Sequence, residues 1–225
     1  MTLPIWHLTA SPQEQAHALA QLITRDLRVA LHQRGTARLA VSGGRSPVPL
    51  LEALSRSPLP WSDITVMLVD ERCVPPTSPD SNEALIRQHL LHRAAALARF
   101  SPPKPGPIDP PAALDVLVLG MGADGHTASL FPDDPALDQA LDLKQPPAYL
   151  AVQPVSSPWR RLTLNLSAIV QAERIYVAIA GAAKRRVLEQ ALLAGPSRPP
   201  IGVVLAASAA RAGLHWCPEP DQAAP

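Results

Sequence analysis

Apolar positions along the chain follow helical spacing in some stretches and form continuous runs in others. The first helix is predicted to begin after Ser11, because Pro12 suits the first helical position and Glu14 completes a capping box. Apolar residues then recur at helical spacing as far as Leu31, and Gly35 favours a stop. Further helices are predicted from Ser46 through Leu54, over residues 81–93 and over residues 184–193.

The nearly continuous apolar runs between these helices are typical of strands buried on both faces of a sheet. Strands are predicted at residues 39–42, 64–69, 114–119, 149–152, 162–166, 175–180 and 203–206. Strands that alternate with helices favour an α/β fold with a doubly wound, mostly parallel sheet and helices on both faces. In such a sheet, ligands bind beyond the carboxyl ends of the strands.

The composition supports one globular domain. The chain has 225 residues, of which 47% are apolar and 17% are charged, so it can bury a sizeable core. We expect a single α/β domain over residues 1–217, followed by a proline-rich tail over residues 218–225. A second proline-rich stretch, residues 101–111, is interpreted as a stiff surface connection, because the strands on both sides of it are needed for one sheet.

Charge and cysteine content narrow the class of protein. A net charge of +1 predicts no broad attraction to nucleic acid or anionic lipid. No apolar run reaches the ~20 residues that cross a bilayer, and the first ten residues do not resemble a signal peptide. Cys73 and Cys217 lie far apart and form no metal-binding spacing, which favours free thiols. We therefore expect a cytoplasmic protein, either a monomer or a small homo-oligomer, without nucleic-acid or membrane partners.

Two polar segments follow predicted strands and contain residues that could bind an anion. Ser42, Gly43 and Gly44 precede a predicted helix, where glycines let the backbone approach an anion closely. A tight strand-to-helix turn would use the same residues, so the pattern leaves both interpretations open. Arg72 follows Asp70 and could hold a phosphate through two parallel hydrogen bonds, although a solvated strand end would look the same.

Two later cations extend this pattern. Arg161 precedes a predicted strand, and Lys184 follows another strand where a predicted helix begins. Each could add a positive charge to the same end of the sheet, but solvation alone would explain either of them.

The most informative segment is GMGADGHTAS at residues 120–129. It matches the dinucleotide pattern GxGxxG, but a dinucleotide fold needs a long helix and an acidic residue about 20 positions later. Here residues 131–135, FPDDP, break the chain instead. We interpret the segment as a wide turn that projects Asp124 and His126 into a cleft. Histidine titrates near neutral pH, so His126 is suited to act as a general base.

At these motifs the chain resembles the 6-phosphogluconolactonase family. The matching segments are SGG at 42–44, DERCVP at 70–75, SN at 81–82, LGMGADGHTASLFP at 119–132, RLT at 161–163 and GxxK at 181–184. The resemblance implies an α/β fold shared with sugar-phosphate isomerases and glucosamine-6-phosphate deaminase. It also implies hydrolysis of 6-phosphogluconolactone, a small phosphosugar lactone, to 6-phosphogluconate in the pentose phosphate pathway, without a cofactor.

By position, the resemblance implies that His126 is the base and Asp124 its acidic neighbour. It places Arg72, Arg161 and Lys184 near the substrate phosphate. Members of the family often have a small hydroxyl residue where this chain has Arg45. Arg45 could therefore add to phosphate binding or point to solvent.

The chemistry of a lactone fits this site, because an activated ester needs only water and one base. We expect His126 to take a proton from the attacking water, and backbone amides of the glycine loops to stabilise the oxyanion. Asp124 would either orient His126 or bind a sugar hydroxyl. The three cations would anchor the phosphate far from the reacting carbon.

Three other functions compete with this hypothesis. An amino-sugar phosphate deaminase would continue the turn with a segment like IAFNEP and carry Tyr in place of Arg72. A serine hydrolase would use Ser42, because residues 40–44, AVSGG, loosely resemble a nucleophile elbow. Gly44 and the anion-binding role of this loop argue against that reading. A non-catalytic sugar-phosphate sensor would carry a DNA-binding helix pair, for which the residues before Leu39 leave no room.

Overall fold

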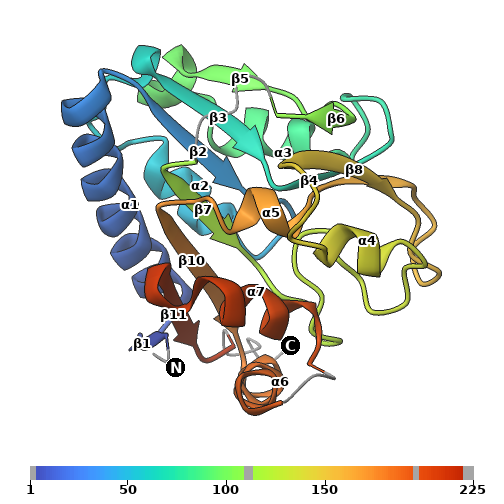
Figure 1. Cartoon of the computed structure of the whole chain (residues 1–225). Helices are drawn as coiled ribbons and strands as arrows, with labels where there is room; N and C mark the ends of the chain where they lie inside the picture. Colours follow the sequence, from blue (N-terminus) through green and yellow to red (C-terminus); the bar gives the residue numbers. More distant parts are fainter. Residues whose placement is uncertain (1–3, 109–113, 195–197, 220–225) are drawn as a thin grey trace, which may run out of the picture.

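A seven-stranded parallel sheet organises the computed structural model, which describes residues 4–108, 114–194 and 198–219 (Figure 1). The strand order is β1-β11-β10-β7-β2-β3-β5. The strands are β1 (Ile5–Leu8), β2 (Ala37–Val41), β3 (Ile64–Leu68), β5 (Arg99–Ser101), β7 (Val116–Leu119), β10 (Arg174–Ala180) and β11 (Ala212–Cys217). The predicted α/β fold with a mostly parallel sheet is confirmed.

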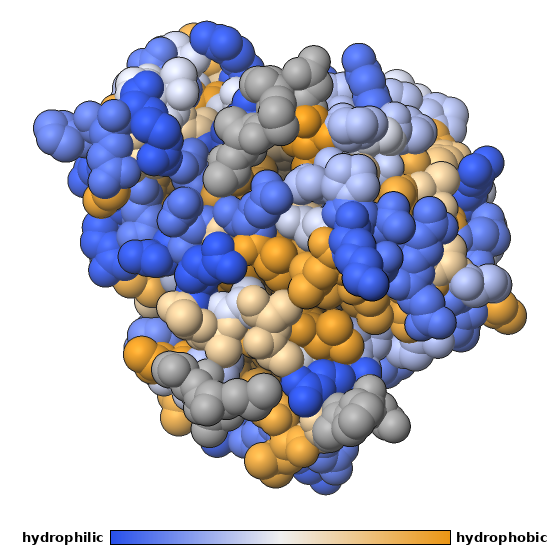
Figure 2. All heavy atoms as spheres, viewed as in Figure 1, coloured by the Kyte–Doolittle hydropathy of each residue, from blue (hydrophilic) through white to orange (hydrophobic). Residues whose placement is uncertain are grey.

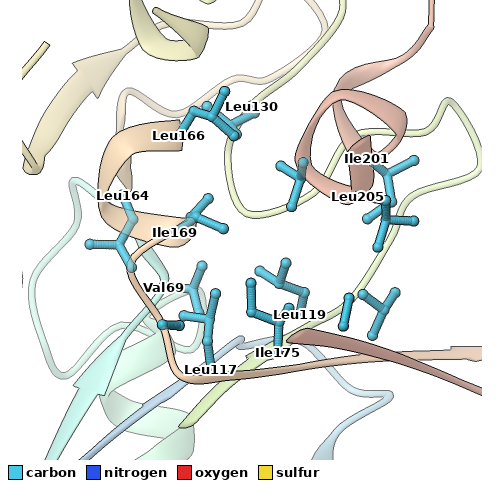
Figure 3. Packing of buried hydrophobic residues seen from close by; sticks show 14 of the residues in the cluster. Val69, Leu117, Leu119, Leu130, Leu164, Leu166, Ile169, Ile175, Ile201 and Leu205 are labelled. Atoms are coloured by element: carbon cyan, nitrogen blue, oxygen red, sulfur yellow. The ribbon is translucent and has the colours of Figure 1, made fainter. Parts of the chain in front are cut away.

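Helices cover both faces of this sheet. Helices α1 (Pro12–Arg34), α2 (Val48–Leu54) and α3 (Asn82–His89) contribute to the core on one face. The other face packs against α4 (Leu137–Leu141), α5 (Leu166–Ile169), α6 (Ala182–Leu193) and α7 (Pro200–Ser208). Figure 3 shows α5 and α7 over the sheet, through contacts that include Leu117, Ile169, Ile175, Ile201 and Leu205.

The position of β7 in the sheet explains why its sequence is apolar throughout. Val116 and Val118 belong to the core on the α1 side, whereas Leu117 and Leu119 belong to the core on the α5 side. Successive side chains of a strand point to opposite faces, and here both faces are covered by helices. Figure 2 shows the outer surface of the same layers, with hydrophilic residues along α1 and hydrophobic residues over α5 and α7.

Local signals place the ends of α1. The Ser11 hydroxyl accepts a hydrogen bond from the Glu14 amide at 3.2 Å, and the Glu14 carboxylate accepts one from the Ala10 amide at 2.8 Å. At the other end, Gly35 has φ of 74° and its N–H donates to the Leu31 carbonyl at 2.8 Å. The predicted start and stop of this helix are confirmed.

A second, antiparallel sheet corrects one expectation. It has the order β4-β9-β8-β6, from β4 (Asp70–Arg72), β6 (Gly106–Pro107), β8 (Ala148–Val152) and β9 (Arg161–Leu164). Strands on both sides of the first proline-rich stretch share the parallel sheet, as expected, but the strands predicted at residues 149–152 and 162–166 belong to this second sheet. The connection between β8 and β9 spans residues 153–160, which is too short for the crossover that parallel strands require.

A second prediction is wrong at residues 203–206, which lie in α7 and not in a strand. Periodicity alone cannot distinguish a short buried helix from a buried strand, but Pro200 at the first helical position favours a helix. Strands β1 and β11 were not predicted. The helix predicted over residues 81–93 ends at His89, and Arg93–Leu97 forms a 3₁₀ turn.

The structure also bears on the predictions for the two cysteines, for membrane spans and for the proline-rich segments. Cys73 is exposed, Cys217 is buried, and both are free thiols. None of the helices in the described ranges is both long and apolar enough to cross a membrane. Residues 109–111 of the proline-rich stretch and residues 220–225 of the proposed tail lie outside the described residues.

Candidate active site

The site lies where the winding of the parallel sheet changes direction. From β2 the chain continues outward to β3 and β5, whereas from β7 it continues to β10 and β11 on the other side. Because β2 and β7 are neighbours, their carboxyl ends open a crevice of the kind that binds ligands in doubly wound sheets. A cleft of about 960 Å³ lies there. It is lined by the predicted site residues Ser42, Gly43, Gly44, Arg72, His126, Arg161 and Lys184.

Asp124 and His126 form a directly bonded pair in the turn after β7. The Nδ1 atom of His126 lies 2.6 Å from Oδ1 of Asp124, which also accepts the His126 backbone N–H at 3.1 Å. A carboxylate at this distance favours the tautomer that carries its proton on Nδ1, which leaves Nε2 as the basic nitrogen. Gly125, with φ of 80°, allows the turn that brings these side chains together.

The imidazole of His126 is closely packed against Phe131 and Gly122. The ring of His126 stacks on the ring of Phe131, with centroids 4.0 Å apart and planes 20° apart. A Cβ atom at Gly122 would lie 2.2 Å from Cε1 of His126 and 2.5 Å from Oδ1 of Asp124. Only glycine fits at this position without moving the ring. The His126 side chain is still 28% exposed, so it remains accessible to water and substrate.

Ser42 joins the ends of the two central strands. Its hydroxyl donates to the Val118 carbonyl at 3.0 Å and accepts from the Gly120 N–H at 3.3 Å. The side chain is buried, and its proton points to a carbonyl and not to an imidazole. This geometry gives Ser42 a structural role and lends no support to a serine nucleophile.

The amides of the first loop are better placed than those of the second to bind an anion. Within the described residues, the N–H groups of Gly43 and Gly44 make no hydrogen bond, and both glycines line the cleft. In the second loop, Gly120 donates to Ser42 and Gly122 donates to the His126 carbonyl at 2.9 Å. That backbone amides of the glycine loops stabilise an oxyanion stays a prediction.

Two arginines lie next to each other on neighbouring strands of the four-stranded antiparallel sheet, called the small sheet below. Arg72 of β4 and Arg161 of β9 are direct partners in the antiparallel register. The sequence placed Arg161 before its strand, but it is the first residue of β9. Like charges that lie directly opposite each other destabilise a strand pair, so the pair favours a site for an anion.

Arg161 is the more deeply placed of the two. Its guanidinium donates to Ser157 Oγ at 3.1 Å, to Ser129 Oγ at 3.3 Å and to Asp70 Oδ2 at 3.5 Å, and its side chain is only 14% exposed. Burial lowers the pKa of Arg161, whereas the carboxylate of Asp70 opposes that effect. Asp70 also accepts a 2.5 Å hydrogen bond from the Ser129 hydroxyl. The buried Asp70 carboxylate thus holds both the Arg161 guanidinium and the Ser129 hydroxyl.

The remaining cations lie around the same cleft. Arg72 Nη1 donates to the Asp80 carbonyl at 2.7 Å and to Asn82 Oδ1 at 3.0 Å. Lys184 lies in the first turn of α6, and Arg45 is exposed at the mouth of the cleft. Neither Lys184 nor Arg45 forms an ion pair in the described part of the chain. That all three predicted cations reach one phosphate stays a prediction.

Sequence reasoning did not assign roles to three further side chains at the cleft. Asp70 and Phe131 hold Arg161 and His126, and Asn82 contacts both Arg72 and the first glycine loop. Asn82 was visible only as part of the SN motif, and Phe131 only as part of the segment that breaks the chain. Neither motif by itself indicates which side chain the residue contacts.

Comparisons with known proteins show which family the chain belongs to. The family described as glucosamine-6-phosphate isomerases/6-phosphogluconolactonase matches residues 10–216. The 6-phosphogluconolactonase of Pseudomonas aeruginosa is 43% identical over 235 residues, which cover 96% of this chain and 94% of that protein. The crystal structure of a 6-phosphogluconolactonase from Shewanella baltica is 34% identical with a TM-score of 0.86, over 95% of this chain and 97% of that one.

The fold alone is shared more widely. A monomeric glucosamine-6-phosphate deaminase is only 16% identical but has a TM-score of 0.72 over 96% of this chain and 97% of its own length. The architecture therefore does not separate lactone hydrolysis from deamination. Together, the match over residues 10–216 and the relative at 43% identity show that this chain belongs to the glucosamine-6-phosphate isomerase/6-phosphogluconolactonase family.

Proposed function

We propose that this chain is a hydrolase that opens 6-phosphogluconolactone to 6-phosphogluconate. The observation that carries the proposal is the bonded Asp124–His126 pair, whose histidine lines the same cleft as Arg72, Arg161 and Lys184. A general base and a group of cations on one cleft match a substrate that has a reactive ester and a phosphate. The relatives that bear this name are similar over nearly the whole chain, which supports the same assignment.

The reaction follows from the tautomer of His126. Its Nε2 atom takes a proton from water while the water oxygen forms a bond to the lactone carbonyl carbon. The negative charge on the carbonyl oxygen is stabilised by the free N–H groups of Gly43 and Gly44. The bond from the carbonyl carbon to the ring oxygen then breaks, and the ring oxygen receives the proton from His126. Asp124 stabilises the imidazolium that exists between these steps.

The cations bind the part of the substrate that does not react. A phosphate dianion fits between Arg72 and Arg161, where it would offset the repulsion across the β4–β9 pair. Lys184 at the start of α6 adds a third positive charge. This remote binding energy fixes the orientation of the lactone relative to His126.

The test is the rate of opening of freshly generated 6-phosphogluconolactone, with the spontaneous rate subtracted. General base catalysis contributes about 10²–10⁴-fold, so His126→Ala should lower kcat by that factor with little change in KM. His32→Gln, a change at an exposed histidine of α1, is the matched control and should keep wild-type kcat. Unchanged turnover in His126→Ala would exclude His126 as the base.

The same protein should be assayed with glucosamine 6-phosphate, because the fold is shared with a deaminase. Ammonia release without acceleration of lactone opening would replace the proposed reaction by deamination. The cytoplasmic location, the absence of nucleic-acid partners, the choice between monomer and small homo-oligomer, and the domain boundary at residue 217 stay predictions.

A further inference from the structure

We propose that Asn82 is a positioning residue that holds the Arg72 guanidinium in the arrangement that binds the substrate phosphate. The proposal rests on the function proposed above. Asn82 is the first residue of α3, its side chain lines the cleft, and the residue is only 2% exposed. A buried amide at the edge of a polar cleft must satisfy both its donor and its acceptor, so its contacts define one orientation.

The two ends of the amide have different partners. The Nδ2 atom of Asn82 donates to the Asp70 carbonyl at 2.9 Å, and Oδ1 accepts from Arg72 Nη1 at 3.0 Å. A carbonyl can only accept and a guanidinium can only donate, so the position needs one donor and one acceptor at fixed places. Aspartate lacks the donor and leucine lacks both. The chemistry of the site therefore favours an amide of this length.

The same amide lies against the first glycine loop. A Cβ atom at Gly43 would be 1.9 Å from Oδ1 of Asn82 and 2.1 Å from its Cγ. The Asn82 amide therefore occupies the space that a side chain at position 43 would need. Gly43 follows β2, whereas Arg72 lies in β4, just after β3. Asn82 thus contacts both the loop whose free amides face the cleft and the arginine that faces it from the small sheet.

The backbone of Asn82 is fixed as well. The Glu71 carboxylate accepts the N–H groups of Asn82 at 2.8 Å and Glu83 at 2.7 Å, together with the Ser81 hydroxyl at 3.0 Å. A carboxylate at the start of a helix is a stable cap for its free amides. Because Glu71 precedes Arg72 in the chain, the same short segment anchors the helix and presents the arginine.

The contact with Asn82 matters because electrostatic repulsion acts on the Arg72 guanidinium. It lies opposite Arg161 in the register of the small sheet, and the two positive charges repel each other. In the absence of the phosphate, the hydrogen bonds to Asn82 and to the Asp80 carbonyl hold the guanidinium in place. Loss of the Asn82 side chain would let Arg72 turn toward solvent, which would weaken phosphate binding without touching His126.

The test compares Asn82→Ala and Asn82→Leu, which is close in size to asparagine but has neither donor nor acceptor, with wild type. A hydrogen bond to a charged group is worth about 1.5–3 kcal/mol, so we expect KM for 6-phosphogluconolactone to rise roughly 10–100-fold while kcat changes little. The inhibition constant of inorganic phosphate should rise by a similar factor. The kcat/KM for the unphosphorylated gluconolactone should stay at the wild-type value, because that substrate does not use Arg72.

Asn165→Ala is the matched control. Asn165 is also a buried asparagine at a helix start, with hydrogen bonds to Ala148, Ala168 and Pro146, but it lies outside the cleft. It should lower stability and leave the phosphate inhibition constant unchanged. If Asn82→Ala does not fold, Asn82→Leu gives the same comparison, because leucine also lacks the acceptor for Arg72.

Two results would overturn the proposal. One is a wild-type phosphate inhibition constant in both Asn82 variants, and the other is an equal loss of kcat/KM with both lactones, which would indicate general damage to the fold. Calorimetric binding of inorganic phosphate needs no turnover. A wild-type protein that binds phosphate but does not open the lactone would refute the proposed function, while the effect of Asn82 on phosphate affinity could still be measured.

Discussion

His215 predicts how the stability of the fold depends on pH. The residue is 1% exposed in β11, stacks on His7 with ring centroids 4.5 Å apart and meets Tyr176 at 5.5 Å. Within the described residues, neither ring nitrogen of His215 has a hydrogen-bond partner. Burial, with a smaller contribution from the charge on His7, lowers the pKa of His215 from 6.5 to about 4. The folded state therefore holds a neutral imidazole.

The sign of the effect follows from the two pKa values. Above pH 6.5 the imidazole is neutral in both states, so the stability does not depend on this group. As the pH falls from 6.5 toward about 4, the unfolded chain binds a proton that the folded chain does not, and stability is lost. The difference of about 2.5 pH units corresponds to roughly 3 kcal/mol, of which about 2 kcal/mol is lost by pH 5.

The measurement is urea unfolding of wild type and His215→Leu at about pH 7.5 and about pH 5. Leucine has no titrating group, so the free energy of unfolding of the variant should gain about 2 kcal/mol relative to wild type between the two pH values. His32→Gln, an exposed histidine, controls for surface titration. A difference between wild type and His215→Leu that is the same at both pH values would refute the reasoning.

Two further predictions concern the cleft. Gly122→Ala would place a Cβ atom 2.2 Å from the ring of His126, so the ring must move, and kcat should fall at least about 100-fold while circular dichroism still shows a folded protein; a kcat close to wild type would contradict the tight fit. Ser42→Ala removes the hydrogen bonds that join β2 and β7. It should lower the free energy of unfolding by about 1 kcal/mol and retain most activity, whereas a serine nucleophile would make it inactive.

Features of the fold that depend on residues close together in the sequence could be predicted. The ends of α1 could be predicted because Ser11, Glu14 and Gly35 act within one turn of the helix. The apolar run in α7 could not be assigned by periodicity, since the helix is buried and apolar over most of its surface. Strand β11 was missed because its sequence, AGLHWC, mixes a glycine and a histidine with apolar residues, and the buried histidine acquires its environment only from β1 and Tyr176.

The part of the candidate site that lies at the ends of the parallel strands could be predicted from the sequence. Parallel strands end at one edge, so the segments after β2, β3 and β7 were expected to meet, and they line one cleft. The pairing of Arg72 with Arg161 was not predictable, because it depends on the register of an antiparallel sheet. The contact of Asn82 with Gly43 depends on the packing of α3 against a distant loop, for which the sequence has no local signal.

The position of the cleft at the change in winding direction has a consequence for how the chain folds. The contacts that close it join residues far apart in sequence, such as Ser42 with Val118, 76 positions apart, and Arg161 with Asp70, 91 positions apart. Contacts of such high sequence separation require the ends of long loops to meet, and topologies rich in them fold slowly. Helix α1 contains its own caps and can form early. The cleft, in contrast, needs residues from distant segments, so no short fragment of the chain can form it. Nascent chains should therefore acquire helical structure well before they acquire catalytic competence.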